Sequence, residues 1–461
     1  MRLSELSSTD INNNNSLFRD PHPVTSGPTS AKRITHLPTT RPTSPTRTPI
    51  RMYSTLSAIH CYFPPPLLAT FQLLWRRILN WSSVLKPYQH HQHQNQLPSP
   101  TPNTNDATML PRASISSHSL GRAWVHGLEA KLDAAAAHAM DIELFYEDLL
   151  YVAKALPGGA TDANHLQAAS TIRAMCEARD LSIICLQPFM HYEGLRDRAW
   201  HAERVREMKL WIQMAHLLGT NIIAIPSTFL PEEVASGDME LIVSDLREVA
   251  DLGAAEGIQF AYENLAWGTY VDTWEAAYEV VRRVDRANFG ICLDTFNIAA
   301  RIYADPEAAD RRTEDAEAVF AASMERLVAT VDPKKIVFVQ VVDGEFLADG
   351  PLVEGHRYYN AAQPARMSWS RNCRLFYGES ERGAYLPVRQ VLEAILVGLG
   401  WRGRISAELF SASLVEEGAH VPEEHATRAA ESWQKLLRDL GMSAASKRRA
   451  SLMQPEQVAR L

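Results

Sequence analysis

The chain has 461 residues, of which 46 % are hydrophobic, and a formal net charge of −8 at pH 7. This length allows one large domain and an appended segment. The charge is uneven, because residues 1–108 hold ten Lys and Arg against four Asp and Glu, which leaves residues 109–461 strongly acidic. An acidic globular part argues against a general nucleic-acid-binding role, which needs a basic surface.

The cysteine content predicts a reducing environment. There are five cysteines, an odd number, and none forms a CxxC pair. Such a pattern is typical of an intracellular protein without a disulfide framework, so we expect a cytoplasmic location. The sequence has no run of about 18 apolar residues, and we therefore expect no association with a membrane.

Residues 1–108 differ in kind from the rest of the chain. They contain the tracts NNNN, TSPTRTP, PPP and HHQHQNQ. Polar and proline-rich tracts cannot bury enough apolar surface to fold, so we expect a disordered, low-complexity extension. Its lack of acidic residues between Asp20 and Asp106 resembles a transit peptide, but it has no clear amphipathic helix at its start. Met109 precedes the first strand-like segment and would be a sensible true start.

Short apolar runs rich in β-branched and aromatic residues recur from Ala113 onward. Runs of this kind are typical of buried parallel strands. The eight expected strands are 113–120, 141–148, 181–189, 221–227, 258–264, 289–297, 335–343 and 404–410.

Helical patterns separate and follow these strands, and several of them close with Gly, a common C-terminal stop signal. The expected helices are 128–140, 165–180, 203–219, 241–257, 274–285, 315–331, 388–400 and 426–441. Eight strand–helix units predict an α/β fold of the (β/α)₈, or TIM, barrel type over residues 109–445, followed by a basic tail at 446–461. A doubly wound open sheet is the alternative, but no GxGxxG motif follows the first strand.

The longest irregular stretch runs from residue 344 to residue 387, after the seventh strand. It is rich in Arg and aromatic residues, as in HRYYN and RMSWSRNCRLFYGESERG. Loops of this length in a compact domain are usually functional or disordered. The composition of this one predicts a lid or an anion-binding loop.

The last four expected strands each end in an oxygen-bearing side chain. These residues are Glu263, Asp294, Gln340 and Glu408. The C-terminal ends of barrel strands form the active-site face, so the four side chains should converge there. Oxygen donors of this kind suit Mg²⁺ or Mn²⁺, with Co²⁺ as a further candidate. Gln340 has the alternative of being a hydrogen-bonding core residue.

Three residues are candidates for acid/base catalysis: His118 near the end of the first strand, and His191 and Glu193 just past the third. Histidine suits this work because its pKa lies near neutrality. The alternatives are capping for His118 and simple exposure for His191. Glu143, in the second strand, points either into the barrel mouth or toward a partner cation, and the sequence does not decide between them.

Ser370, Arg371 and Arg374 are the best candidates for holding a substrate carboxylate. Arginine binds carboxylates through a bidentate fork, which Lys cannot form. A structural salt bridge is the alternative role. We also place Asn297 in the site, where it would contact the substrate or orient a metal ligand, unless it only caps the next helix.

Several segments together resemble one family. They are, in order, ISSHSLGR, ELFYEDL, LQPF with HYEGL, ENLAWG, CLDTFNI, VQVVDGE, RMSWSRNCRLFYGE and AELF. Over about residues 111–440 their order and spacing resemble fungal-type 3-dehydroshikimate dehydratases, within the xylose-isomerase-like sugar phosphate isomerase/epimerase superfamily.

The resemblance implies a metal-dependent barrel that converts 3-dehydroshikimate into protocatechuate and water in quinate catabolism. By motif, the four strand-end residues would hold the metal, and Ser370 and Arg374 would contact the substrate. Bacterial relatives tend to have His where Asn297 stands, so no base role transfers to that position. Epimerase relatives commonly have His where Gln340 stands, which favours the dehydratase interpretation.

Two other functions stay open. A keto-sugar isomerase or epimerase would use the same metal without loss of water, and a metabolite-binding barrel would leave its ligand unchanged. In each case the expected partner is a small molecule, 3-dehydroshikimate for the dehydratase, and neither nucleic acid nor a membrane. Whether the protein forms a homo-oligomer is left open.

Overall fold

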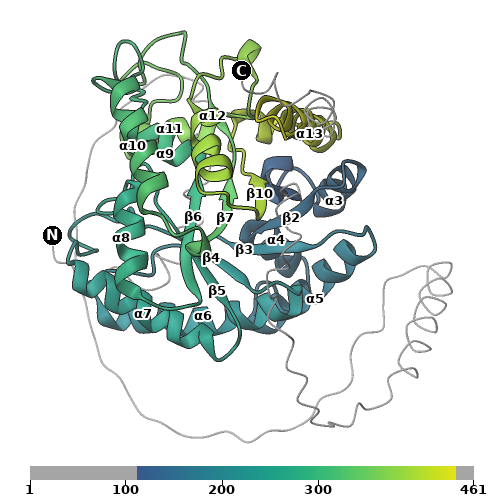
Figure 1. Cartoon of the computed structure of the whole chain (residues 1–461). Coiled ribbons are helices and arrows are strands. Elements are labelled where there is room, and N and C mark those ends of the chain that lie inside the picture. The colour runs from purple at the N-terminus through teal and green to yellow at the C-terminus, as the bar shows by residue number, and fades with distance from the viewer. Residues whose placement is uncertain (1–111, 443–461) are drawn as a thin grey trace, which may run out of the picture. The chain divides into compact units, whose positions relative to one another are not determined.

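Eight parallel strands close into a barrel in the computed structural model of the protein, which describes residues 112–442 (Figure 1). The strands are β1 (Arg112–Ser116), β2 (Asp141–Phe145), β3 (Ile183–Gln187), β4 (Ile222–Pro226), β5 (Gln259–Glu263), β6 (Phe289–Asp294), β7 (Ile336–Gln340) and β10 (Arg404–Ala407). Their order around the barrel is β1-β10-β7-β6-β5-β4-β3-β2, so the predicted (β/α)₈ barrel is confirmed. The extension expected at 1–108 and the tail expected at 446–461 lie outside the described residues.

Parallel pairing brings the C-terminal ends of all eight strands to one face of the barrel. Between β4 and β5, for example, the register runs from Ile222 opposite Gln259 to Pro226 opposite Glu263. Alternate residues of each strand point into the barrel, where a small apolar core fills the space below this face. That inner core contains Cys185, Ala224, Ala261, Cys292 and Phe338, and Ile184 packs with them.

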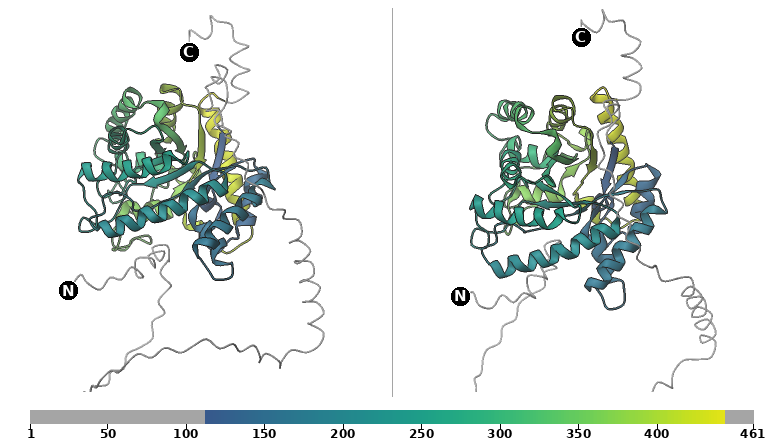
Figure 2. Two further views of the ribbon diagram at one scale, coloured as in Figure 1. Left: turned by 90° about the horizontal axis from the view of Figure 1, so that it is seen from below. Right: turned by 60° about the horizontal axis from the view of Figure 1, so that its bottom comes forward.

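Helices surround the strands on the outside of the barrel (Figures 1 and 2). They are α3 (Leu128–Ala137), α4 (Tyr146–Lys154), α5 (Asp162–Glu177), α6 (Arg198–Leu218), α7 (Met239–Ala254), α8 (Trp274–Val284), α9 (Thr295–Ile302), α10 (Ala316–Thr330), α11 (Ala365–Asn372), α12 (Val388–Leu392) and α13 (Val421–Asp439). No helix within 112–442 is long and apolar enough to cross a membrane.

Two helices show why these segments fold as the sequence predicts. In α8, Trp274, Ala277, Tyr278 and Val281 are buried, a spacing that places them on the single face turned toward the barrel. Helix α6 is followed directly by Gly219, whose φ of 78° lies in the left-handed region that Gly adopts without steric cost.

Three described helices were not predicted from the sequence. Helices α4 and α9 start immediately after β2 and β6, inside segments expected to continue as strands, and α11 lies within the long irregular stretch. The helix expected over 388–400 is also irregular, because α12 continues as a π-helical turn at Glu393–Gly398. The four cysteines of the described part are buried and unpaired.

Part of the stretch 344–387 lies against the C-terminal face of the barrel, where the Arg374 N–H donates to the Phe410 carbonyl at 2.9 Å. Its two short strands, β8 (Asp343–Gly344) and β9 (Arg374–Leu375), pair antiparallel. The Oδ1 atom of Asp343 accepts hydrogen bonds from the backbone N–H groups of Gly344, Tyr385 and Leu386, at 2.7, 3.1 and 2.8 Å. One buried carboxylate therefore ties the beginning of the stretch to its end.

Candidate metal and substrate site

Three of the predicted metal ligands meet at the C-terminal face of the barrel. Glu263 ends β5, Asp294 ends β6 and Glu408 follows β10, and each offers a carboxylate oxygen within 4.8 Å of the other two. All three side chains are buried. We call Glu263, Asp294 and Glu408 the inner carboxylate group.

Two amide side chains hold this group in place. The Nδ2 atom of Asn297 donates to Glu263 Oε1 at 2.8 Å and to Asp294 Oδ2 at 2.7 Å. The Nε2 atom of Gln187 donates to Glu408 Oε1 at 2.7 Å. Hydrogen bonds of this kind orient carboxylates for metal binding. The geometry thus supports the orienting role considered for Asn297, while its contact with substrate stays a prediction.

Gln340, the fourth predicted ligand, lies at the level of Asp294, its register partner on β6. Its Nε2 atom donates to Glu143 Oε1 at 2.7 Å, and its Oε1 atom accepts from Cys292 Sγ at 3.4 Å. Glu143 therefore points into the barrel, which answers the question that the sequence left open. Whether the Gln340 oxygen binds a metal is not decided by these contacts and stays a prediction.

Arg374 is the positive charge beside the inner carboxylate group. Although only 2 % exposed, it places Nη1 3.0 Å from Asp294 Oδ2 and 3.2 Å from Glu408 Oε2. Its Nε donates to Ser370 Oγ at 3.0 Å. Its guanidinium carbon lies 4.4 Å from the centre of the Phe296 ring, which fixes the plane of the group. The predicted residues Ser370 and Arg374 are therefore part of one buried unit with two candidate metal ligands.

The charges of this site suit a divalent cation. Burial raises the pKa of Glu408 to about 8, and it also raises the pKa values of Glu263 and Asp294, while the adjacent Arg374 lowers all three. A single guanidinium is too little positive charge for three buried carboxylates, so a proton or a cation must make up the balance. Carboxylate and amide oxygens are ligands that Mg²⁺ and Mn²⁺ accept. The residues present fit such an ion.

Arg371 lies in α11, one residue after Ser370. Its Nη1 atom donates to Gln363 Oε1 at 2.6 Å. Burial and the nearby Arg122 lower its pKa to about 10, so the guanidinium is still charged at neutral pH. Its contact with a substrate carboxylate stays a prediction.

His118 is enclosed between two aromatic rings. The ring centres of Phe145 and Phe410 lie 4.6 and 4.3 Å from that of the imidazole. Neither imidazole nitrogen has a hydrogen-bond partner among the described residues. Burial lowers the pKa of His118 well below its usual value, so the ring is neutral and poorly placed to receive a proton.

His191 is half-buried and lies at the end of β3 beside β4. Its Nδ1 atom is 3.3 Å from Thr228 Oγ1, and its ring meets the Phe229 ring edge-on with centres 4.5 Å apart. Burial and the charge of Arg204 lower its pKa to about 3. At neutral pH the imidazole is therefore uncharged, as that of His118 is, but it is not enclosed between two aromatic rings.

Glu193 lies on the helix-facing side of the strands. Its Oε1 atom accepts from the Thr228 N–H at 2.7 Å and from the Tyr262 hydroxyl at 3.1 Å. Tyr262 belongs to the core between barrel and helices, whereas its neighbour Glu263 points into the barrel. Burial raises the pKa of Glu193 to about 7. These contacts favour a structural role for Glu193, which links the ends of β3, β4 and β5.

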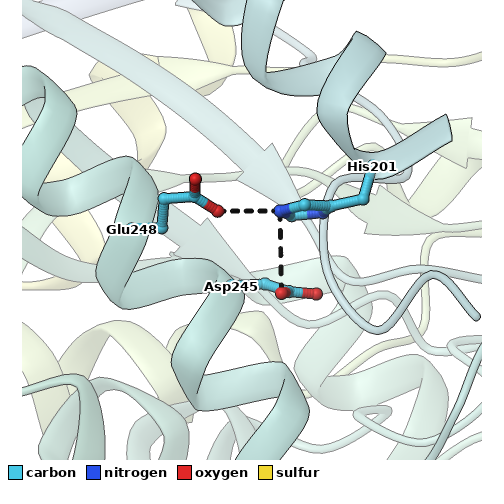
Figure 3. Close-up of side chains that lie close together, drawn as sticks. All are labelled: His201, Asp245 and Glu248. Atoms are coloured by element: carbon cyan, nitrogen blue, oxygen red, sulfur yellow. Dashed lines mark hydrogen bonds and ion pairs between the residues drawn. The ribbon is translucent and has the colours of Figure 1, made fainter. Parts of the chain in front are cut away.

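A second group of potential ligands lies between α6 and α7 (Figure 3). We call His201, Asp245 and Glu248 the outer group. His201 Nε2 lies 2.8 Å from Glu248 Oε2 and 3.6 Å from Asp245 Oδ1. Asp245 also accepts two hydrogen bonds from Arg198, at 2.6 and 3.1 Å, and one from the Gly194 N–H at 2.9 Å. The outer group thus holds the loop that contains His191 and Glu193 in place.

The sequence did not assign roles to Glu143 and Gln187, although both contact predicted ligands. Each is a polar residue at an inward position of an otherwise apolar strand. That alternation is the signal that could have found them, because a polar side chain inside a barrel requires a partner.

The chain belongs to the xylose isomerase-like TIM barrel family, because the family model matches residues 132–437. Within this class, its sequence is 54 % identical over 342 residues to a protein of Neurospora crassa named 3-dehydroshikimate dehydratase. That match covers 72 % of this chain and 95 % of the relative. The resemblance stated from the motifs is therefore confirmed.

Two solved structures show the same fold. A xylose isomerase-like TIM barrel/4-hydroxyphenylpyruvate dioxygenase fusion protein matches with a TM-score of 0.55 and 25 % identity, over 75 % of this chain and 46 % of that protein. An IolI protein, described with a bound zinc atom, matches with a TM-score of 0.52 and 19 % identity, over 71 % of this chain and 99 % of that protein.

Proposed function

We propose that this chain is a hydro-lyase that converts 3-dehydroshikimate into protocatechuate and water with the help of a divalent metal ion. The observation that carries the reaction is the 54 % identity to the Neurospora crassa dehydratase over 95 % of that protein's length. The inner carboxylate group and Arg374 supply a charged, buried site at the barrel face where catalytic residues of this fold gather.

We assign the ion to the inner carboxylate group and the Oε1 atom of Gln340. Mg²⁺ and Mn²⁺ are the first candidates, and Co²⁺ is a further one. Bound there, the ion would stabilise negative charge on the ketone oxygen of the substrate while a proton leaves the neighbouring carbon. Asn297 and Gln187 keep the carboxylates in position throughout.

Arg374 is the residue that we assign to the substrate carboxylate. Its Nε and Nη1 atoms are used by Ser370, Asp294 and Glu408, and among the described residues no hydrogen bond is made by Nη2. That atom is the donor available to a substrate. Arg371, at the end of α11, would add a second charge, and together they would orient the substrate ring over the carboxylates.

The reaction also needs a group that moves a proton. The substrate loses a proton from the carbon beside its ketone, and its hydroxyl group then leaves as water. We assign the first transfer to His191, whose neutral imidazole can accept a proton and is half-exposed. His118 is enclosed by two phenylalanine rings and Glu193 faces the helices, so both are weaker candidates.

The test uses the purified full-length chain. We expect protocatechuate to form when 3-dehydroshikimate is added with Mg²⁺, Mn²⁺ or Co²⁺. Its ultraviolet absorbance measures the reaction, and we expect EDTA to stop it. The matched control is Glu248→Gln in the outer group, which should keep full activity because Glu248 lies outside the barrel.

Two results would overturn the proposal. Folded protein that makes no protocatechuate with any of the three ions would exclude the reaction, and turnover of ketohexoses instead would identify a keto-sugar epimerase. Undiminished dehydration in EDTA, with no metal retained by the protein, would keep the reaction but exclude the metal.

A further inference from the structure

Glu143 is a buried acid whose main contact crosses the interior of the barrel. It comes from β2 and its side chain is fully buried. Its Oε1 atom accepts the 2.7 Å hydrogen bond from Gln340 Nε2, although β1 and β10 lie between β2 and β7 in the barrel. The Glu143 carboxyl group therefore reaches across the barrel to the N–H₂ group of Gln340, which cannot bind a cation.

A glutamine can serve as a metal ligand only through its oxygen. The two ends of the amide are similar in size, so packing alone distinguishes them poorly, whereas an acceptor placed at one end selects the N–H₂ group there. The Glu143 carboxyl group keeps an acceptor oxygen whether or not it is protonated, and it therefore provides such an acceptor. With Nε2 held by Glu143, the Oε1 atom of Gln340 is turned toward β6, on which Cys292 donates to it and Asp294 lies in register.

The surroundings of Glu143 show that packing does not explain its presence. Polar groups surround it, and the buried hydroxyls of Ser114 and Ser116 have no hydrogen-bond partner among the described residues. Ser116 is in register with Glu143, and Ser406 is in register with Gln340. An apolar side chain would fill this position without the desolvation cost of a carboxyl group.

We propose that Glu143 is a positioning residue that fixes the amide of Gln340 so that its oxygen faces the inner carboxylate group. This inference rests on the metal role given to Gln340 under the proposed function. It adds a residue that touches neither the ion nor the substrate but acts through the amide. Removing a hydrogen-bond partner of a metal ligand typically weakens metal binding by about 10- to 100-fold.

The test measures Mn²⁺ affinity of the full-length chain, from the electron paramagnetic resonance signal of the free ion. Glu143→Met keeps the length of the side chain but removes its oxygens, and we expect Mn²⁺ to bind roughly 10- to 100-fold more weakly. Glu143→Gln keeps a carbonyl that can accept from Gln340 but adds an N–H₂ group that can donate to the Gln340 oxygen, so its loss of affinity should be smaller than that of Glu143→Met.

A double-mutant cycle separates positioning from general damage to the fold. If Glu143 acts through the amide, Glu143→Met should have no further effect on Mn²⁺ affinity in a Gln340→Ala background. Equal losses in both backgrounds would overturn the inference, and so would an unchanged affinity in Glu143→Met alone. An unmodified chain that binds no Mn²⁺ would instead remove the metal role itself, and the inference with it.

A crystal structure of the Mn²⁺-loaded, unmodified chain gives an answer even if Glu143→Met does not fold. We expect Gln340 Oε1 to contact the ion while Nε2 keeps its hydrogen bond to Glu143. Loss of that hydrogen bond on loading, or an ion held by the three carboxylates with Gln340 turned away, would overturn the inference.

Discussion

The inner carboxylate group and the outer group look alike in composition but differ in their surroundings. Each brings three potential metal ligands within 4.8 Å of one another. In the inner group all three are buried, and Arg374, only 2 % exposed, contacts Asp294 and Glu408. In the outer group the side chain of Glu248 is 50 % exposed, and the carboxylate of Asp245 is already satisfied by Arg198 and a backbone N–H.

The difference gives a criterion that separates a candidate metal site from an ion-pair network. A partly exposed group with its own guanidinium and a histidine is balanced by solvent and by its neighbours. Three buried carboxylates are not, and burial raises their pKa values because a charge there lacks solvation. An excess of buried acid over base at the C-terminal strand ends is therefore the feature that points to metal chemistry.

The largest effect is expected for Glu408→Gln. This change keeps the shape of the side chain but removes one ligand charge, so metal binding should be lost and kcat/KM for dehydration should fall by roughly 10³-fold, about 4 kcal/mol. Metal content by mass spectrometry and the rate of protocatechuate formation measure it. Glu248→Gln, the same exchange in the outer group, should change neither. Equal losses in both variants would erase the distinction between the groups.

A smaller loss is expected for Arg374→Ala. The substrate carboxylate loses its guanidinium partner and its fixed orientation, so kcat/KM should fall by about 10²-fold. Mn²⁺ should bind several-fold more tightly, because Arg374 and the ion compete for the same carboxylates. Steady-state kinetics and a Mn²⁺ titration test the two effects separately. Weaker Mn²⁺ binding in this variant would show that Arg374 supports the metal ligands rather than opposing the ion.

The next largest effect is expected for Glu193→Gln, in which the free energy of unfolding should depend less on pH. The folded-state pKa of Glu193, about 7, lies above its unfolded value, so the protonated acid favours folding below about pH 4.5. That contribution is lost as pH rises through about 7. Urea unfolding between pH 5 and pH 8 should show about 2 kcal/mol less pH-dependent loss in Glu193→Gln than in the unmodified chain. Parallel pH profiles would mean that Glu193 is ionised at neutral pH.

Much of the fold followed from local patterns in the sequence. All eight barrel strands lie within or close to the predicted segments. Apolar β-branched runs and Gly at helix ends are local signals, which can be recognised within one segment of the sequence. Helices α4 and α9 were missed because they start without a linker, so Tyr146 and Thr295 read as continuations of their strands. Periodicity cannot separate the two cases over so few residues.

The site was predicted in part, for a related reason. Topology alone brings strand ends together, so the convergence of Glu263, Asp294 and Glu408 could be expected from the barrel. The contact between Glu143 and Gln340 spans 197 residues and the barrel interior, and no local pattern encodes it. Likewise, the sequence placed Arg374 in the site but could not show that its partners are Asp294 and Glu408.

The smallest effect is expected for Asp245→Asn in the outer group. The amide keeps one oxygen for the Gly194 N–H but weakens the bonds to Arg198, and the free energy of unfolding should fall by about 1–2 kcal/mol. The loss is limited because the Arg198 side chain is 47 % exposed, so water still solvates its charge. Urea unfolding measures this change, and Mn²⁺ affinity should be unaltered. If Asp245→Asn instead weakened Mn²⁺ binding as strongly as Glu408→Gln, the outer group would be a metal site in its own right. The balance of carboxylates by neighbouring basic side chains would then not distinguish the two groups.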